Sequence, residues 1–153
     1  MKKICVIICY FGTLPLWFKL WMISASNNKK IDFLLFTDND IENDIAENIE
    51  IIKMTPMNFC DICKEKINID IEIKKAYKLC DFKPAYGKIF EDYIKKYEYW
   101  GCCDLDLLWG KISDFYNYED IKQYEKVNWC GHFTLYKNNE EINNLFMMKG
   151  RSI

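Results

Sequence analysis

The stretch that decides the fold is Ile4-Cys5-Val6-Ile7-Ile8-Cys9, an uninterrupted apolar run near the amino terminus. β-branched residues favour strands, and an apolar run without polar alternation is typical of a strand that is buried on both faces. We therefore predict a central strand of a parallel sheet over residues 3–9.

The same run, together with Lys2 and Lys3 before it, also imitates a secretory signal peptide. Gly12, Pro15 and Lys19 interrupt the apolar stretch that follows, and this interruption favours the strand. We expect a helix from about Leu14 onward. Trp17, Leu20, Trp21 and Ser24 fall on one face of this helix, and the spacing leaves open whether the tryptophans lie in the core or at the surface.

Strand and helix patterns alternate along the rest of the chain. Further strands are predicted at 31–36, at 48–53, in the segment that carries Asp104 and Asp106, and at 127–136 with an interruption at Gly131-His132. Further helices are predicted at 56–67, 84–97 and 140–148, and a short helix or turn at 73–80. The best-patterned helix is 84–97, with the supporting charge pairs Glu91–Lys95 and Asp92–Lys96 on its outer side. This order predicts an α/β fold, with a mainly parallel sheet flanked by helices, in a single domain over residues 1–153.

The segment Trp100-Gly101-Cys102-Cys103-Asp104-Leu105-Asp106 carries the most informative chemistry. Positions i and i+2 of an extended chain point to the same side, so we expect Asp104 and Asp106 to project together while Leu105 faces the core. Two adjacent carboxylates are costly unless a cation compensates them. Mg²⁺ or Mn²⁺, completed by substrate phosphates, is the simplest compensation.

Polar turns follow three of the predicted strands, at Tyr10-Phe11-Gly12, Thr37-Asp38 and Asp104-Leu105-Asp106. In open α/β sheets, ligands bind outside the carboxyl ends of the strands. The three turns are therefore predicted to meet in one cleft.

Five segments together resemble a known family: ICYFGTLPLWFKLW, IDFLLFTD, YKLCDFKPAYGKIFEDYI, YWGCCDLDLLWG and GHFTLYKNN. They resemble the glycosyltransferases of the GT-A fold that use a D-x-D motif, and most closely the bacterial enzymes of surface-polysaccharide synthesis. The resemblance covers most of residues 4–139 and implies a GT-A-like (Rossmann-like) sheet.

The resemblance assigns a role to each matching position. It implies that Asp104 and Asp106 are catalytic and hold Mn²⁺ or Mg²⁺ against the diphosphate of a UDP- or GDP-sugar. The nucleotide-sugar-binding positions that it implies are Tyr10, Phe11, Gly12, Thr37, Asp38, Asp81 and Lys83. Lys83 would neutralise phosphate as a point charge.

The resemblance also implies partners and a location. We expect a glycan or lipid-linked acceptor, a cytoplasmic enzyme at the inner face of the membrane, and a chain that lacks the acceptor-side region of the longer family members. Nucleic acid is not expected as a partner, because 21 basic and 23 acidic residues give a net charge of −2.

Other interpretations of these residues remain open. The chain could be an inactive nucleotide-sugar-binding remnant, or a zinc or redox module built on Cys60, Cys63, Cys130 and His132. Asp104 and Asp106 could pair structurally with lysines, Tyr10 and Phe11 could be core aromatics, and His132 could be structural. The eight cysteines lie mainly in apolar runs, so we expect reduced thiols rather than disulfides.

Overall fold

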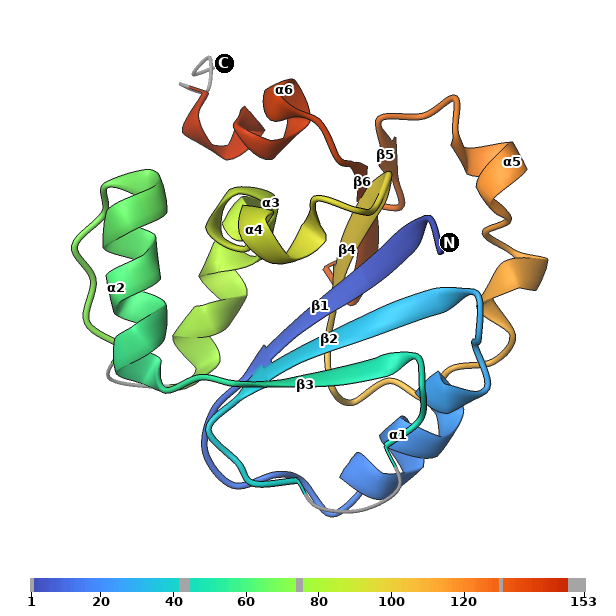
Figure 1. Cartoon of the computed structure of the whole chain (residues 1–153), viewed down its shortest axis with the longest axis horizontal. Helices are drawn as coiled ribbons and strands as arrows, with labels where there is room; N and C mark the ends of the chain where they lie inside the picture. The colour runs from blue at the N-terminus through green and yellow to red at the C-terminus, as the bar shows by residue number, and fades with distance from the viewer. Residues whose placement is uncertain (1, 42–44, 74–75, 130, 149–153) are drawn as a thin grey trace.

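A six-stranded mixed sheet forms the centre of the computed structural model (Figure 1), which describes residues 2–41, 45–73, 76–129 and 131–148. In spatial order the strands are β3 (Ile49–Lys53), β2 (Ile31–Thr37), β1 (Ile4–Tyr10), β4 (Tyr99–Cys103), β6 (Phe133–Lys137) and β5 (Lys126–Val127). β1 is parallel to β2 and β4, and β2 to β3, whereas β6 is antiparallel to β4 and β5. The predicted α/β class and the parallel centre of the sheet are confirmed.

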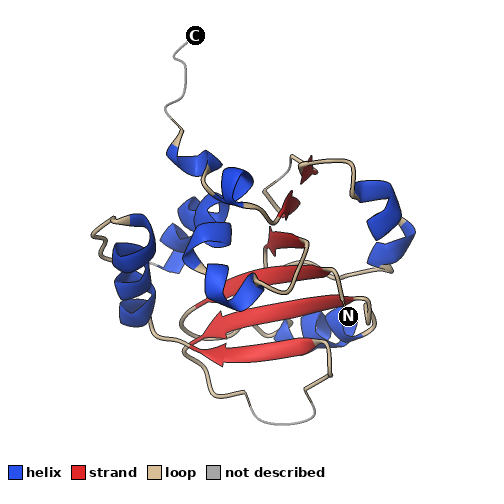
Figure 2. Ribbon diagram, turned by 45° about the horizontal axis from the view of Figure 1, so that its top comes forward, coloured by secondary structure: helices blue, strands red, loops and turns tan. Residues whose placement is uncertain are grey.

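Helices cover both faces of this sheet (Figure 2). They are α1 (Phe18–Ser26), α2 (Pro56–Ile67), α3 (Tyr86–Ile89), α4 (Glu91–Ile94), α5 (Tyr118–Ile121) and α6 (Glu140–Asn143), with 3₁₀ turns η1 (Ala76–Ala85), η2 (Ile112–Asp114) and η3 (Leu145–Met147). None of the helices in the described ranges is long and apolar enough to span a bilayer.

The central strand β1 is buried on both sides, as its unbroken apolar sequence predicts. Cys5 and Ile7 pack into the core under α2, α3 and α4. Ile4, Val6 and Ile8 pack into the opposite core, which α1 covers with Trp21 and Ala25. Alternate side chains of one strand thus fill two separate cores, and both are apolar.

The first helix begins later than predicted, at Phe18, and its buried residues are Trp21 and Ala25. Trp17 and Leu20, which the spacing places on the same face as Trp21, are 48% and 55% exposed. Residues around this helix are apolar on nearly every side, so periodicity cannot select the buried face.

The predicted helix over 84–97 is interrupted. Pro84 lies inside η1, and the chain leaves helical geometry at Phe90 (φ −103°, ψ 21°) between α3 and α4. The Phe90 ring stacks on Phe36 with a centroid separation of 4.0 Å, so packing on the sheet overrides helix propensity here. Pairs at i,i+3 spacing replace the predicted i,i+4 charge pairs: Asp92 pairs with Lys95, and Glu91 pairs with Lys88.

The strand order creates a switch point between β1 and β4. From β1 the chain passes to β2 and β3 on one side, and it returns to place β4 on the other side of β1. In open α/β sheets, the crevice outside the carboxyl ends of strands at such a point is the usual ligand site.

Candidate functional site

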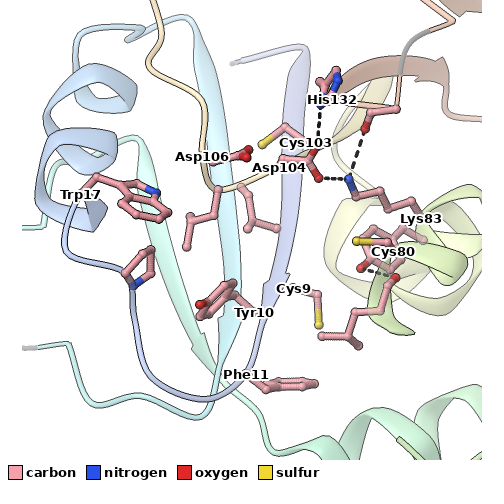
Figure 3. Close-up of a pocket in the computed structure, with 16 residues that line it drawn as sticks. Cys9, Tyr10, Phe11, Trp17, Cys80, Lys83, Cys103, Asp104, Asp106 and His132 are labelled. Atoms are coloured by element: carbon pink, nitrogen blue, oxygen red, sulfur yellow. Dashed lines mark hydrogen bonds and ion pairs between the residues drawn. The ribbon is translucent and has the colours of Figure 1, made fainter. Parts of the chain in front are cut away.

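A cavity of about 680 Å³ opens at this switch point. Its walls contain the end of β1 with Tyr10 and Phe11, and the segment after β4 with Asp104 and Asp106. Figure 3 shows Tyr10 and Trp17 on one side of the cavity and Lys83 and Cys80 on the other. Its volume lies within the range of small-molecule sites, roughly 300–1,000 Å³.

Asp104 is the most densely contacted group of the cavity. One carboxylate oxygen forms an ion pair with Lys83, and the other lies 2.9 Å from Nδ1 of His132 (Figure 3). The antiparallel register of β4 and β6 pairs Cys103 with Phe133, which brings His132 opposite Asp104. The Asp104 backbone N–H also donates to the His132 carbonyl at 3.0 Å. The strand pairing therefore fixes the position of this carboxylate.

Lys83 is held in the ammonium form at the wall of the cavity. Its side chain is 14% exposed, and Nζ also donates to the Gly131 carbonyl at 3.2 Å. Burial lowers the pKa of Lys83, whereas the hydrogen bond and negative charge of Asp104 raise it by more, so the pKa lies above its ordinary value. A positive charge thus lies beside Asp104, at the wall of the cavity that Asp106 also lines.

Asp106 lies at the same cavity but outside the strand. β4 ends at Cys103, and Leu105 and Asp106 form a turn, so the predicted strand geometry for the two aspartates is not what brings them together. Leu105 is buried, as predicted. Across the described part of the chain, no hydrogen bond or ion pair engages the Asp106 carboxylate.

The two carboxylates fit one kind of metal site and not another. Among the residues that the structure describes, no group of three or more His, Cys, Asp or Glu side chains could hold an ion, which disfavours a closed, all-protein site. Mg²⁺ and Mn²⁺ sites of phosphate enzymes need only one or two carboxylates, with substrate phosphates as further ligands. The free Asp106 carboxylate and the remaining lone pairs of Asp104 suit such an ion.

Three of the predicted binding residues form a separate polar cluster at the ends of β1 and β2. The Gly12 N–H donates to Oδ1 of Asp38 at 2.9 Å, and Asn39 donates to the Gly12 carbonyl and to Oγ1 of Thr37. These residues tie the two loops together, but Gly12, Thr37 and Asp38 are not among the cavity walls. The structure therefore brings two of the three predicted turns to the cavity itself.

Phe11 and Asp81 also have structural contacts that qualify their predicted roles. The Phe11 ring packs edge-on against Phe59 in the core, although Phe11 also lines the cavity. Asp81 is exposed and pairs with Lys78 at 3.0 Å, whereas its predicted companion Lys83 pairs with Asp104. Asp81 is not part of the cavity wall.

Sequence reasoning missed several walls of the cavity. Trp17 was left open between core and surface, Cys80 was assigned no role, and His132 was left open between a metal ligand and a structural residue, whereas all three line the cavity. Trp17 is the N-cap of α1, outside the helix in which its spacing was counted, and Cys80 lies within the 3₁₀ turn η1, where no motif marked it. His132 gave no local signal, because its position beside Asp104 depends on the pairing of β4 with β6.

The cysteines give little support to a zinc or redox centre. The described cysteines are all free thiols, and Cys130 lies outside the described residues. Burial, with a smaller contribution from Cys60, raises the pKa of Cys63 to about 12. A reactive C-x-x-C thiol requires a lowered pKa, so this environment is opposite to what redox chemistry needs.

Comparison with known families matches residues 6–152 of this chain, nearly all of it, to a family of unknown function, DUF6625. The chain belongs to the DUF6625 family. No curated protein matches the chain. The DUF6625 match begins within β1 and extends beyond η3, so the whole sheet after its first residues and the cavity at its switch point lie within the family region.

Proposed function

We propose that this chain is a metal-dependent glycosyltransferase that binds a nucleoside-diphosphate sugar in the cavity at the switch point. The observation that carries the proposal is the convergence of Asp104, Asp106 and Lys83 on one cavity at the carboxyl ends of parallel strands. The strand order and the parallel centre also support a GT-A-like fold, which the D-x-D resemblance implies.

The charge arrangement supports a diphosphate as the bound group. A diphosphate has several negative oxygens, and Lys83 supplies a fixed ammonium group to it as a point charge. Asp106 and Asp104 would hold Mn²⁺ or Mg²⁺, which supplies Lewis-acid stabilisation of the departing diphosphate. Because His132 and Lys83 both contact Asp104, that carboxylate is held in a fixed orientation before the donor binds.

The remaining walls suit the uncharged parts of a donor. Tyr10 and Trp17 offer aromatic surface on the side of the cavity away from Lys83 (Figure 3). An aromatic wall can accommodate a base or a sugar ring by stacking. The donor would therefore lie with its phosphates toward Lys83 and its rings toward Tyr10 and Trp17.

Calorimetric titration with UDP- and GDP-sugars, with and without Mn²⁺, tests the proposal. We expect binding that requires Mn²⁺ and that is lost in Asp104→Ala and Asp106→Ala. Asp61→Ala is the control, because it removes an exposed carboxylate of α2 that does not line the cavity. Binding without metal dependence, or no binding to any donor, would overturn the proposal.

Donor turnover separates an active enzyme from a binding remnant. If the chain binds the donor in the presence of Mn²⁺ but releases no nucleoside diphosphate with any acceptor, the transferase activity is excluded while donor binding stands. Release that depends on both aspartates supports the full proposal.

A further inference from the structure

A second cavity, of about 540 Å³, lies at the opposite end of the sheet, where β1 and β2 begin. Four lysines contribute to its walls: Lys2, Lys3, Lys29 and Lys30. The segment around α5 closes the other side, with Tyr116 and Tyr118 (Figure 1, near the label N). A chain of net charge −2 thus concentrates positive charge at one place.

Strand register forces the lysines together. β1 and β2 are parallel, with Ile4 opposite Ile31, and a Lys-Lys pair immediately precedes each of these residues. The two pairs therefore begin neighbouring strands side by side. Like charges next to each other across strands are destabilising unless an anion or a carboxylate compensates them.

Carboxylates compensate only one of the two pairs. Lys2 binds Asp32 at 2.6 Å, and Lys3 forms an ion pair with Glu98. Across the described ranges, no carboxylate forms an ion pair with Lys29 or Lys30. Glu119 also lines the cavity, but its carboxylate pairs with Lys122 at 2.5 Å. Two ammonium groups at the cavity thus remain without a counter-charge in the described chain.

A buried asparagine holds the turn that carries these two lysines. Asn28 is 6% exposed, and its side-chain amide donates a hydrogen bond to the Gly110 carbonyl at 3.0 Å. Its Oδ1 accepts the Ile112 N–H at 2.8 Å. These bonds fasten the turn before β2 to the segment that leads to the opposite wall. Asn28 before the two lysines and Ile31 in β2 after them are therefore both held in place, which fixes the backbone that carries Lys29 and Lys30.

We propose that this cavity is an anion site that binds a phosphate group, separate from the donor cavity at the other edge of the sheet. A phosphate monoester carries about −1.5 to −2 charges at pH 7, which matches the two uncompensated ammonium groups. The phosphate can come from a small phosphorylated metabolite or from phosphatidic acid in a membrane, because both present a phosphate monoester. The proposal does not depend on the proposed transferase function.

Titration of the full chain with inorganic phosphate, followed by NMR of the tyrosine ring signals, tests this site. The measurements use a Lys83→Ala background, so that phosphate binding at the other cavity does not contribute. We expect shifts at Tyr116 and Tyr118, and affinity that falls about tenfold or more in Lys29→Glu/Lys30→Glu, since charge-assisted hydrogen bonds are lost. Lys19→Glu/Lys137→Glu is the control, because it makes the same charge change at exposed positions outside the cavity.

Vesicle sedimentation identifies the source of the phosphate. Vesicles that contain phosphatidic acid are compared with vesicles of phosphatidylcholine, for the parent and both double variants. Retention on phosphatidic acid that Lys29→Glu/Lys30→Glu alone abolishes assigns the site to a lipid headgroup, whereas phosphate binding without retention assigns it to a soluble ligand. Equal behaviour of the two double variants, or no binding in either assay, would overturn the proposal.

Discussion

The two ends of the central sheet differ in the sign of their charge. At the carboxyl ends of β1 and β4, two aspartates line a cavity, and one of them is paired with Lys83. At the amino ends of β1 and β2, four lysines line a cavity, and two of them are paired with carboxylates. The same strands thus carry an acidic site at one end and a basic site at the other.

The difference follows from where charges stand relative to each strand. Lys-Lys precedes β1 and β2, whereas aspartates follow β2 and β4, and these strands run in the same direction. Parallel pairing therefore collects like residues at the same edge. A single charged residue beside a strand is unremarkable, but its repetition in parallel strands makes a charged edge.

The largest effect is expected from a substitution that changes only the acidic site at the carboxyl ends of β1 and β4, here called the acidic edge. Asp106→Asn removes a carboxylate that has no partner in the described chain, so Mn²⁺-dependent donor binding should fall about a hundredfold or more. The free energy of unfolding should change by less than about 0.5 kcal/mol, because no contact is lost. Calorimetry and urea denaturation measure the two quantities.

Asp104→Asn is the companion that separates binding from stability. It should also abolish metal dependence, but it weakens the ion pair of half-buried Lys83 and should destabilise the fold by about 1 kcal/mol. Neither variant should alter phosphate binding at the basic edge. Equal stability losses in the two aspartate variants would contradict the different roles given to them.

The next largest effect is expected from a substitution that changes only the basic site at the amino ends of β1 and β2, here called the basic edge. Asn28→Ala removes buried hydrogen bonds to Gly110 and Ile112, and it should lower the free energy of unfolding by about 2 kcal/mol, measured by urea denaturation. The turn with Lys29 and Lys30 should loosen, so phosphate binding weakens while donor binding is retained. Asn27→Ala is the control, since Asn27 is exposed at the end of α1. A parental stability for Asn28→Ala would show that the turn is held by other contacts.

A smaller effect concerns the lysine that lies at the acidic edge. The pKa of Lys83 is raised in the folded chain, so its pairing contributes stability that is full below its ordinary pKa of 10.5. That contribution disappears as pH rises through the higher folded pKa. Lys83→Met should therefore be less stable than the parent by about 1 kcal/mol at pH 8, with the difference shrinking above pH 10.5. Urea titrations across this pH range measure the difference, and a constant difference would contradict the pairing.

Local sequence patterns predicted most of the sheet, because a buried strand shows itself as a short run of apolar residues. The apolar runs of β1 and of Phe33–Phe36 in β2 led to the parallel sheet, and the D-x-D after β4 led to the two aspartates of the cavity. Long-range pairing decided the rest. The position of His132 beside Asp104 depends on the β4–β6 register, which no local pattern encodes.

Apolar abundance limited the prediction of the helices. α1 has hydrophobic residues on nearly all sides, so spacing could not tell that Trp21 is buried while Trp17 lies at the cavity. The segment 84–97 has a clear apolar stripe, yet Phe90 breaks the helix to stack on Phe36. At Phe90, tertiary packing outweighs helix propensity.

The smallest expected effect is on the rate at which Cys80, in the wall of the acidic cavity, is alkylated when a ligand binds at either edge. Cys80 is exposed at the wall of the acidic cavity, whereas burial raises the pKa of Cys102 to about 11 and keeps that thiol protonated. Iodoacetamide at pH 8 should therefore modify Cys80 well before Cys102, as read by peptide mass spectrometry. A nucleotide sugar with Mn²⁺ at ten times its Kd should slow the Cys80 reaction about tenfold, because only the unliganded fraction reacts. In a Lys83→Ala chain, inorganic phosphate bound at the basic edge should leave the alkylation rate of Cys80 unchanged. If phosphate slowed that reaction, the two edges would not act independently.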